Sequence, residues 1–324
     1  MSVRRPFDWR GARILVTGAS GFVGHHLVPA LIERGAEVHA AGFEATPPRL
    51  PFAAWHVAEL RDGASLAAAV AAAQPAAILH LAGQSSTARS FEDPEGTFAL
   101  NALGTWNLLR AVREAAPEAR TLVIGSSDAY GPQPEGTRVT EETPLKPVSP
   151  YALSKAAADS FARVYGSENG LDVIRTRSFG HTGPGQAPTF VAPSFAQQIA
   201  AIEAGRAEPV LRVGNLEVTR DLLDVRDVVR AYLALIERGV RGAAYNVCRG
   251  SGIRLTQLVE RMIARARIPI VVEPDPARFR PADIPYLVGD PSAIGRDTGW
   301  SAEIPLDRTL DELLEEWRGR VSSG

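Results

Sequence analysis

A short apolar run followed at once by three regularly spaced glycines constrains the fold more than any other feature of this 324-residue chain. The run Arg13-Ile-Leu-Val-Thr17 has the composition of a buried strand. It leads directly into Gly18-Ala-Ser-Gly-Phe-Val-Gly24, and apolar residues then recur at helical spacing over His25–Arg34 until Gly35. The order strand, glycine turn, helix predicts the first unit of a dinucleotide-binding α/β domain.

Each glycine of the turn has a separate physical reason to be a glycine. Gly18 permits the tight turn, Gly21 lets the backbone approach a pyrophosphate, and Gly24 lets the helix pack close to the strand. Unpaired N–H groups and the macrodipole at the start of the helix favour phosphate. A purely structural turn is the alternative, but the strand–turn–helix context favours a dinucleotide site. We expect this site to include the other residues of the turn, namely Ser20, Phe22 and Val23.

The end of the second predicted strand, Glu37–Phe43, does not settle which dinucleotide is bound. A fold that selects NAD usually places Asp or Glu there, on the 2′-hydroxyl of the adenosine ribose. The position falls near Gly42, whereas Glu44 comes two residues later and the next arginine is Arg49. The predicted cofactor is therefore NADP or NAD, without an acidic ribose selector at the strand end to repel a 2′-phosphate.

Strands and helices alternate over the first part of the chain. The expected elements are further strands over 52–57, 76–81, 120–124 and 172–177, and helices over 66–73, over 94–116 and from 150 onward. Such alternation predicts one doubly wound parallel sheet of the Rossmann type, with right-handed crossovers. Residues 1–177 are thus predicted to form a dinucleotide-binding domain.

The pattern changes after residue 177. The expected elements are a loop over 178–186, helices near 193–204, 227–238, 255–266 and 306–317, and strands near 210–213 and 245–248. A second continuous strand–helix alternation is missing. We therefore predict that residues 178–324 form a smaller, partly helical substrate-binding domain, some segments of which can return to the first domain.

Composition argues against several classes of partner. The formal net charge of −2 gives no electrostatic reason to bind nucleic acid or an anionic membrane. The start of the chain lacks the apolar segment of a secretory signal, and the apolar run over 14–17 is too short to span a bilayer. Cys248 is the single cysteine, so an internal disulfide is impossible, which fits a reducing cytoplasm. We expect a cytoplasmic protein without a metal site.

A second constellation surrounds Tyr151 and Lys155. Ser149 and Pro150 are an N-cap and a first-turn proline, so a helix is expected to begin here and to place Tyr151 and Lys155 on one face. A cation beside a phenol lowers its pKa, and a tyrosine tuned in this way can exchange a proton with a substrate oxygen. Ser126 adds a hydroxyl at the carboxyl end of a predicted strand, where ligands of parallel sheets bind. Without this context the spacing is a weak signal, because paired surface side chains are common.

Taken together, these residues resemble a known family. Thr17–Gly24, His80–Ser86, Ser126 and the Tyr151-x-x-x-Lys155 pair are similar to those of the extended short-chain dehydrogenase/reductases that act on nucleotide sugars. Within this group the second half most resembles GDP-4-keto-6-deoxy-mannose reductases (GDP-6-deoxy-D-mannose reductases), and next GDP-mannose 4,6-dehydratases. The segments that carry the closer resemblance are 181–186, 213–217, 220–221, 280–285, 289–292, 298–300 and 304–306.

The resemblance implies a role for each matching residue. Ser126 would hydrogen-bond the 4-oxygen of the sugar, Tyr151 would be the acid/base, and Lys155 would hold the nicotinamide ribose and acidify Tyr151. The other implied cofactor contacts are Glu59 and Leu60 at the adenine, and Leu81, Ala82 and Gly83 after a strand. The residues implied in substrate binding are Ser85, Ser126, Ser127, Asp128, Gly180, Asn215, Arg220 and Arg280. The two arginines suit a diphosphate, because the planar guanidinium matches phosphate oxygens.

Some departures from the family pattern bear on the activity. The family often has Asn where Gly180 stands, and that Asn usually touches the sugar phosphates. Related dehydratases have Glu two residues after the catalytic hydroxyl, where Asp128 stands here. Aspartate is shorter by a methylene, and a misplacement of about 1 Å can cost on the order of a hundredfold in rate, which argues mildly against dehydration. We interpret His181 as a structural loop residue, because Tyr151 already supplies the proton.

The favoured function is NAD(P)-dependent reduction of the C4 ketone of a nucleotide-linked 4-keto-6-deoxy sugar, with GDP-4-keto-6-deoxy-mannose as the favoured substrate. A 4,6-dehydratase or a 4-epimerase is the alternative on the same machinery. A non-catalytic dinucleotide-binding regulator is the alternative outside enzymes, and the intact Ser126, Tyr151 and Lys155 argue against it. The resemblance also implies a homodimer in which the helices over 94–116 and 151–167 form a four-helix bundle.

Overall fold

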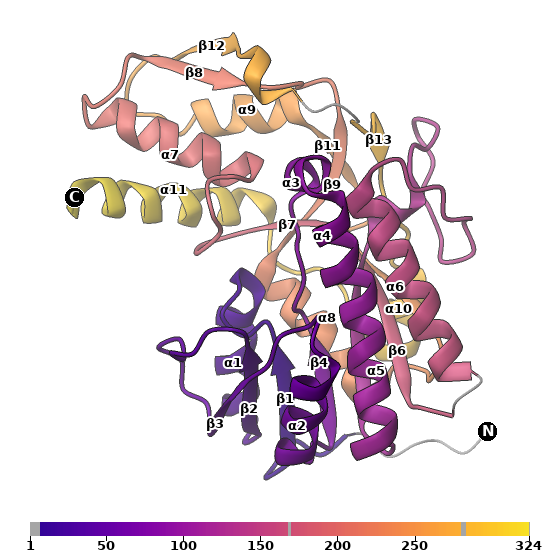
Figure 1. The fold of residues 1–324 in the computed structure, drawn as a ribbon. Coiled ribbons are helices and arrows are strands. Elements are labelled where there is room, and N and C mark those ends of the chain that lie inside the picture. The colour runs from indigo at the N-terminus through magenta and orange to yellow at the C-terminus, as the bar shows by residue number, and fades with distance from the viewer. Residues whose placement is uncertain (1–6, 168–169, 280–282, 324) are drawn as a thin grey trace.

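Seven parallel strands form the central sheet of the protein (Figure 1). The structure is a computed structural model that describes residues 7–167, 170–279 and 283–323. The strand order β10-β6-β5-β4-β1-β2-β3 is that of a doubly wound sheet, as predicted. The strands are β1 (Arg13–Thr17), β2 (Glu37–Gly42), β3 (Ala54–Val57), β4 (Ala77–His80), β5 (Arg120–Ser126), β6 (Val173–Ser178) and β10 (Ala244–Val247).

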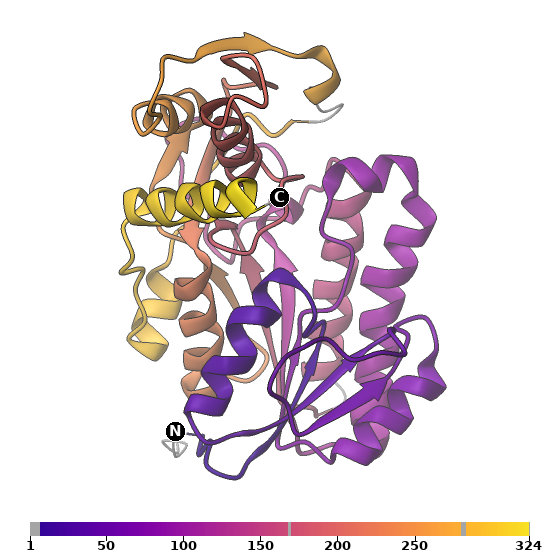
Figure 2. The ribbon, with the colours of Figure 1, turned by 90° about the vertical axis from the view of Figure 1, so that its left-hand side faces the viewer.

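Helices cover both faces of this sheet, and each face has its own apolar core. Figure 2 shows the two layers from the side. One face packs against α1 (Phe22–Glu33), α8 (Val225–Arg238) and α10 (Ser292–Thr298). The other face packs against α2 (Gly63–Ala73), α5 (Gly104–Ala115) and α6 (Pro150–Ser167). Because the strands are buried on both faces, they read as short apolar runs in the sequence.

The prediction of a single helix over 94–116 is wrong in one respect. The structure has α3 (Thr87–Glu92), then α4 (Pro94–Phe98), a π-helical turn over Ala99–Leu103, and α5. The buried side chain of Asn101 lies on this turn and bonds to Gln84 and Ser154. A π-turn inserts one extra residue into the helical repeat, and such turns occur mostly at functional sites. An apolar periodicity does not reveal it.

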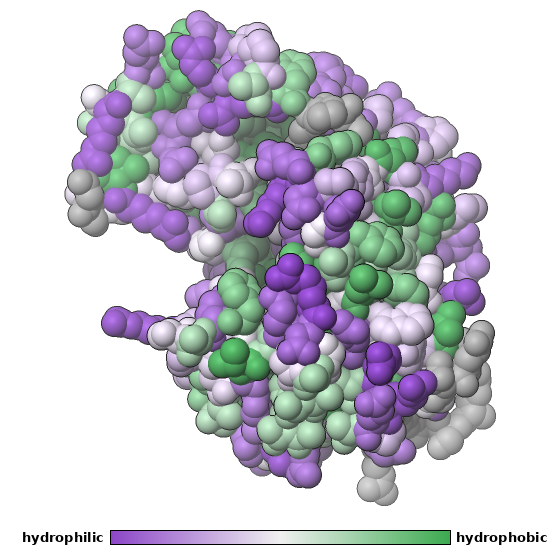
Figure 3. All heavy atoms as spheres, viewed as in Figure 1, coloured by the Kyte–Doolittle hydropathy of each residue, from purple (hydrophilic) through white to green (hydrophobic). Residues whose placement is uncertain are grey.

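The second part of the molecule has an apolar core of its own, built from α7 (Val191–Glu203), α9 (Leu255–Ile263) and α11 (Leu306–Ser323). The predicted strand over 210–213 is confirmed as β8 (Val210–Val213), which pairs with β12 (Val271–Pro274). A small sheet joins the two parts and contains β9 (Thr219–Asp224), β11 (Gly252–Arg254), β13 (Tyr286–Leu287) and β7 (Gly180–Thr182). Figure 3 shows the surface hollowed between the part that carries α7 and α11 and the part that carries α1.

One detail differs from the expectations for the second half. The loop expected over 178–186 contains β7, which pairs in parallel with β9. The helix α8 and the strand β10 belong to the first sheet and its core, although both come after residue 177. The division into 1–177 and 178–324 stays a prediction. Among the described residues, no helix is both long and apolar enough to cross a membrane.

Candidate active site

The glycine turn packs against the end of the neighbouring strand. Gly18 has φ +72°, and a side-chain carbon on it would lie 2.6 Å from the backbone nitrogen of Ala82. A side-chain carbon on Gly24 would lie 2.3 Å from the carbonyl oxygen of Ala19. Gly21 is the N-cap of α1 and caps the helix without a side-chain hydrogen bond. The turn thus gives a ligand close access to the backbone and to the N–H groups of the first turn of α1, which suits a pyrophosphate.

Three strand ends meet beside this turn. β1 lies next to β4, and β4 lies next to β5, so the residues that follow these strands share one edge of the sheet. Gly83 follows β4 with φ +156°, and a side-chain carbon on it would lie 2.6 Å from Asn101 Oδ1 and 3.7 Å from Lys155 Nζ. The absence of a side chain at Gly83 therefore lets the segment after β4 pack closely against Asn101, next to Lys155. The predicted contacts Leu81, Ala82 and Ser85 come from the same segment.

The three predicted catalytic residues come together at this edge. Ser126 ends β5, and Tyr151 and Lys155 occupy the first two turns of α6. The Ser126 hydroxyl lies near enough to the Tyr151 phenol to lower its pKa. Lys155 Nζ donates to the carbonyl oxygen of Ile124 at 3.0 Å. The helix and the strand end thus bring these three side chains to one edge of the sheet.

Burial governs the protonation of these groups. Burial, together with the nearby carboxylate of Asp128, raises the pKa of Tyr151 above its ordinary value, and the Ser126 hydroxyl offsets part of the rise. Burial lowers the pKa of Lys155 to about 8. The lowering of the Tyr151 pKa expected from Lys155 is not seen in this structure, because burial is the largest effect on the phenol and Lys155 is not among the groups that shift its pKa. Tyr151 is therefore a protonated phenol at neutral pH and can donate its proton.

Two buried polar residues support the site without having been singled out from the sequence. His80 Nδ1 lies 2.7 Å from Thr17 Oγ1, and its Nε2 lies 3.2 Å from Thr105 Oγ1. Burial and the charge of Lys155 lower the pKa of His80 to about 3, so the imidazole is neutral. Asn101 Oδ1 accepts from the backbone N–H of Gln84 at 2.8 Å, which holds the segment after β4 in place. Polar residues within an otherwise apolar helical pattern are the sequence signal that could have identified Asn101.

The predicted substrate contacts form two groups. Ser127 and Asp128 lie on a 3₁₀ turn after β5, and Thr87 Oγ1 donates to Asp128 Oδ2 at 3.5 Å. Asn215 and Arg220 meet at one carboxylate, since Asn215 Nδ2 donates to Asp283 Oδ2 at 3.3 Å and Arg220 lies 3.7 Å from Asp283 Oδ1. Arg220 also donates to the carbonyl oxygen of Ile284 at 2.5 Å. Arg280, the other predicted diphosphate contact, lies outside the described residues.

The remaining predicted contacts have specific local surroundings. Gly180 lies on β7, and a side-chain carbon on it would lie 2.8 Å from Leu222 Cδ2, so a larger residue at this position requires a different neighbour. At the predicted adenine contact, Glu59 pairs with Arg61 at 3.2 Å. Leu60 is buried. It packs closely against Gly104, where a side-chain carbon would lie 2.8 Å from Leu60 Cβ.

His181 lies close to the glycine turn but has a structural environment. Its ring stacks on that of Phe22, with centroids 6.1 Å apart, and its Nδ1 lies 3.0 Å from the carbonyl oxygen of Phe179. Burial lowers the pKa of His181. These contacts tie the segment after β6 to the start of α1.

The fold, with the tyrosine and lysine of α6 at the carboxyl ends of the sheet, defines a short-chain dehydrogenase/reductase. The chain belongs to the GDP-mannose 4,6 dehydratase family, whose model matches residues 15–313. The resemblance seen in the motifs is thereby confirmed.

Similar proteins cover almost the whole chain. The GDP-6-deoxy-D-mannose reductase of Pseudomonas aeruginosa is 37% identical over 310 residues, which are 95% of this chain and 98% of that protein. The solved structure of RMD from Pseudomonas aeruginosa complexed with NADPH matches with a TM-score of 0.84 at 35% identity, covering 95% of this chain and 99% of that one. The UDP-glucose 4-epimerase of Thermus thermophilus, in complex with NAD, matches with a TM-score of 0.83 at 31% identity, with the same shares covered.

Proposed function

We propose that this protein is an NAD(P)-dependent reductase that converts the C4 ketone of a nucleotide-linked 4-keto-6-deoxy sugar to an alcohol, with GDP-4-keto-6-deoxy-mannose as the substrate. The observation that carries this proposal is the pair of Tyr151 and Ser126, two neighbouring hydroxyls at the carboxyl end of β5. The similarity to the Pseudomonas aeruginosa reductase supports the choice of sugar.

The residues present fit a dinucleotide. The glycine turn offers the close approach and the helix start that a pyrophosphate needs, and the backbone of Gly83 lies near Lys155. The proposed cofactor contacts are Gly18, Ser20, Gly21, Phe22, Val23, Gly24, Glu59, Leu60, Leu81, Ala82, Gly83, Tyr151 and Lys155. When bound, the reduced dinucleotide supplies the hydride for the ketone carbon.

The side chains of the chain supply the proton and stabilise the developing charge. Tyr151 gives its proton to the carbonyl oxygen as that oxygen becomes an alkoxide, because burial keeps the phenol protonated. Ser126 donates a hydrogen bond to the same oxygen, and donors aimed at developing charge often contribute most to the rate enhancement of an enzyme. Lys155 is cationic below about pH 8 and offsets the charge left on the phenolate.

The residue that follows Ser126 and Ser127, which is Asp128, favours a reductase over a dehydratase. Dehydration requires a base beside the carbon next to the ketone, and the related dehydratases resembled by this chain have glutamate there. Asp128 is shorter, and its Oδ2 accepts from Thr87 Oγ1 at 3.5 Å. We propose that the remaining substrate contacts are Ser85, Ser127, Asp128 and Gly180 near the sugar, and Asn215, Arg220 and Arg280 near the diphosphate.

Substrate panels with a matched variant test this function. The protein is incubated with NADH or NADPH and with GDP-4-keto-6-deoxy-mannose, GDP-mannose or UDP-sugars, and the absorbance of the reduced nicotinamide is followed. Oxidation should occur with the keto sugar alone. Tyr151→Phe should bind the dinucleotide with unchanged affinity but lose at least ~100-fold in turnover, as expected for loss of a general acid. Conversion of GDP-mannose to its keto derivative would show a dehydratase instead, and full activity of the variant would refute the role of Tyr151.

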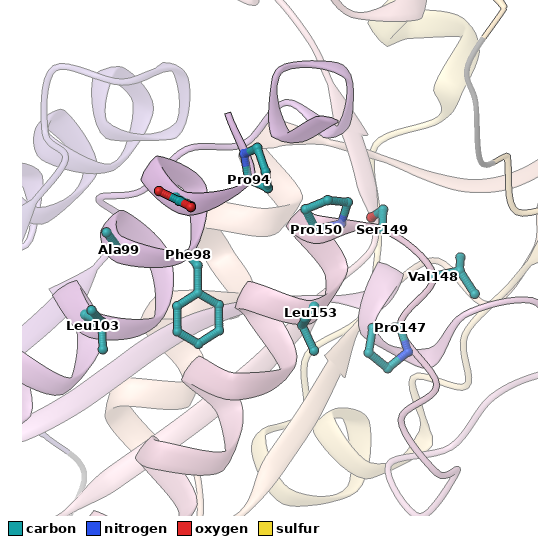
Figure 4. Close-up of a pocket in the computed structure, with 10 residues that line it drawn as sticks. Pro94, Phe98, Ala99, Leu103, Pro147, Val148, Ser149, Pro150 and Leu153 are labelled. Carbon is teal, nitrogen blue, oxygen red and sulfur yellow. The ribbon is translucent and has the colours of Figure 1, made fainter. Parts of the chain in front are cut away.

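We also propose a homodimer in the cytoplasm. The helix α4, the π-helical turn after it and the start of α6 border an apolar groove (Figure 4), lined by Pro94, Glu95, Phe98, Ala99, Leu103, Pro147, Val148, Ser149, Pro150 and Leu153. Leu103 and Leu153 are 47% and 53% exposed, and an apolar patch of this kind marks an interface. Two copies would meet there as a four-helix bundle. The single cysteine, which is buried, fits a reducing compartment.

A further inference from the structure

The end of β2 lacks a side chain of its own, and the carboxylate of Glu44 takes its place. β2 ends at Gly42. A side-chain carbon on Gly42 would lie 2.7 Å from Glu44 Oε2 and 2.5 Å from Trp55 Cη2. Trp55 Nε1 donates to the backbone carbonyl oxygen of Glu44 at 3.0 Å. Trp55 therefore packs against Gly42 and also holds the backbone of Glu44, whose carboxylate lies beside Gly42.

The two oxygens of the Glu44 carboxylate have different surroundings. Oε1 accepts a hydrogen bond from Ser20 Oγ at 3.2 Å, and Ser20 belongs to the glycine turn. Oε2 is shielded from solvent and has no hydrogen-bond partner in the part of the chain that the structure describes. A buried carboxylate oxygen without a donor is unfavourable, because it has lost its water and gained nothing in exchange. Because the protein itself covers Oε2, a ligand hydroxyl would satisfy this oxygen once the carboxylate turns toward the ligand.

We propose that Glu44 selects the dinucleotide in favour of NAD(H) and against NADP(H). This inference rests on the proposed function only in requiring a dinucleotide on the glycine turn. In this class of fold the adenosine ribose lies at the end of the second strand, where its 2′-hydroxyl can donate to an acidic side chain. The carboxylate of Glu44 lies at this end of the strand and is the acidic group that would accept that hydrogen bond. A 2′-phosphate has no proton to donate at neutral pH, and it would place its negative charge against a carboxylate in a shielded site.

The selection is invisible in the linear sequence because Glu44 comes two residues after the strand end. The contacts with Ser20 and Trp55 return its carboxylate to the position that Gly42 leaves open. The combination of a glycine at the strand end and a glutamate two residues later therefore replaces an acidic residue at the strand end.

Direct binding measurements test the proposal without turnover. Dissociation constants for NADH and NADPH are measured by calorimetry for the wild type, for Glu44→Gln and for Glu33→Gln. The wild type should bind NADH at least ~10-fold more tightly than NADPH, since the phosphate meets a like charge. Glu44→Gln should keep its NADH affinity within a few-fold, because the amide oxygen still accepts, while NADPH affinity rises and the ratio falls towards one. Glu33→Gln removes the same charge from the exposed far end of α1 and should leave the ratio unchanged.

The outcomes separate this proposal from the proposed reductase function. NADPH binding equal to or tighter than NADH binding in the wild type, or a ratio that Glu44→Gln does not change, overturns the role of Glu44 even if the keto sugar is reduced. The expected ratios without turnover of any keto sugar uphold the role of Glu44 and overturn the reductase. Binding of neither dinucleotide overturns both.

Discussion

Tyr151 and Lys155 lie one helical turn apart, and burial shifts their pKa values in opposite directions, up for the phenol and down for the ammonium. The two shifts have one physical cause, since burial disfavours the charged form of either group. The two groups therefore respond differently to pH. The phenol does not titrate in the range where the protein works, whereas the ammonium titrates near pH 8. Of these two groups, Lys155 is therefore the one that changes its charge near that pH.

We expect the proposed reduction to lose rate as the pH rises through about 8. Below this pH Lys155 is charged and stabilises the phenolate. Above it that charge is lost, so the rate should fall by about tenfold for each pH unit. The dependence of kcat/KM on pH measures this. Lys155→Arg should remove the alkaline limb, at a lower absolute rate, because a guanidinium does not titrate in this range. A wild-type profile that stays flat up to about pH 10, where an unperturbed lysine titrates, would contradict the assignment.

Some site residues could be predicted from the sequence and others could not, because the two groups are identified by different kinds of information. Tyr151 and Lys155 are related by helical spacing, and Gly18 and Gly24 by a local turn, so the sequence suffices for both pairs. His80 and Asn101 become part of the site through partners 17 to 63 positions away. Such pairings depend on how strands and helices are stacked, and one sequence does not reveal that.

At the scale of elements, the strands and helices of the first sheet were predictable because each is a short apolar run or an amphipathic repeat between turn signals. The short strands of the small sheet in the second part could not be predicted. β7, β11 and β13 have two or three residues each, too few for a periodicity, and they exist because β9 offers them a partner. The π-turn at Asn101 was hidden within an unbroken helical pattern.

One carboxylate stabilises the junction that β9 makes with these segments. Asp221 is buried on β9 and accepts from the backbone N–H groups of Arg249 at 2.8 Å, Gly250 at 2.9 Å and Gly289 at 3.4 Å. Asp221→Ala should lower the free energy of unfolding by about 3 kcal/mol, because several buried donors lose their acceptor. Asp62→Ala, which removes the exposed N-cap of α2, should cost only about 1 kcal/mol. Urea unfolding measures both, and equal losses would contradict the special place of Asp221.

At the scale of the whole molecule, two kinds of surface stand apart. One is the hollow between the two parts, and the other is the apolar groove beside α4 and α6, on the face covered by α5 and α6. The groove contains Leu153, which is two residues from Tyr151 on the same helix. Association through this groove would therefore support the helix that carries the proton donor.

Leu103→Glu should convert the proposed dimer to a monomer at micromolar concentration. The side chain is half exposed in the protomer, so a charge is tolerated there, but it would be buried against a like charge in a symmetric pair. Light scattering after size-exclusion chromatography measures the mass. Val271→Glu changes an exposed apolar residue on β12, in the second part of the molecule, and should leave the mass unchanged. A wild type that elutes as a monomer would contradict the dimer.

The late origin of β10 has a consequence for how the polypeptide matures. The ribosome releases β1 to β6 first, and the outer edge of β6 then has unpaired backbone groups until Ala244–Val247 emerges. An open edge of this kind recruits other strands, and in a crowded cell that leads to aggregation. A fragment that stops before residue 244 would expose this edge permanently. The nascent chain thus depends on its last quarter to complete the sheet that its first residues begin.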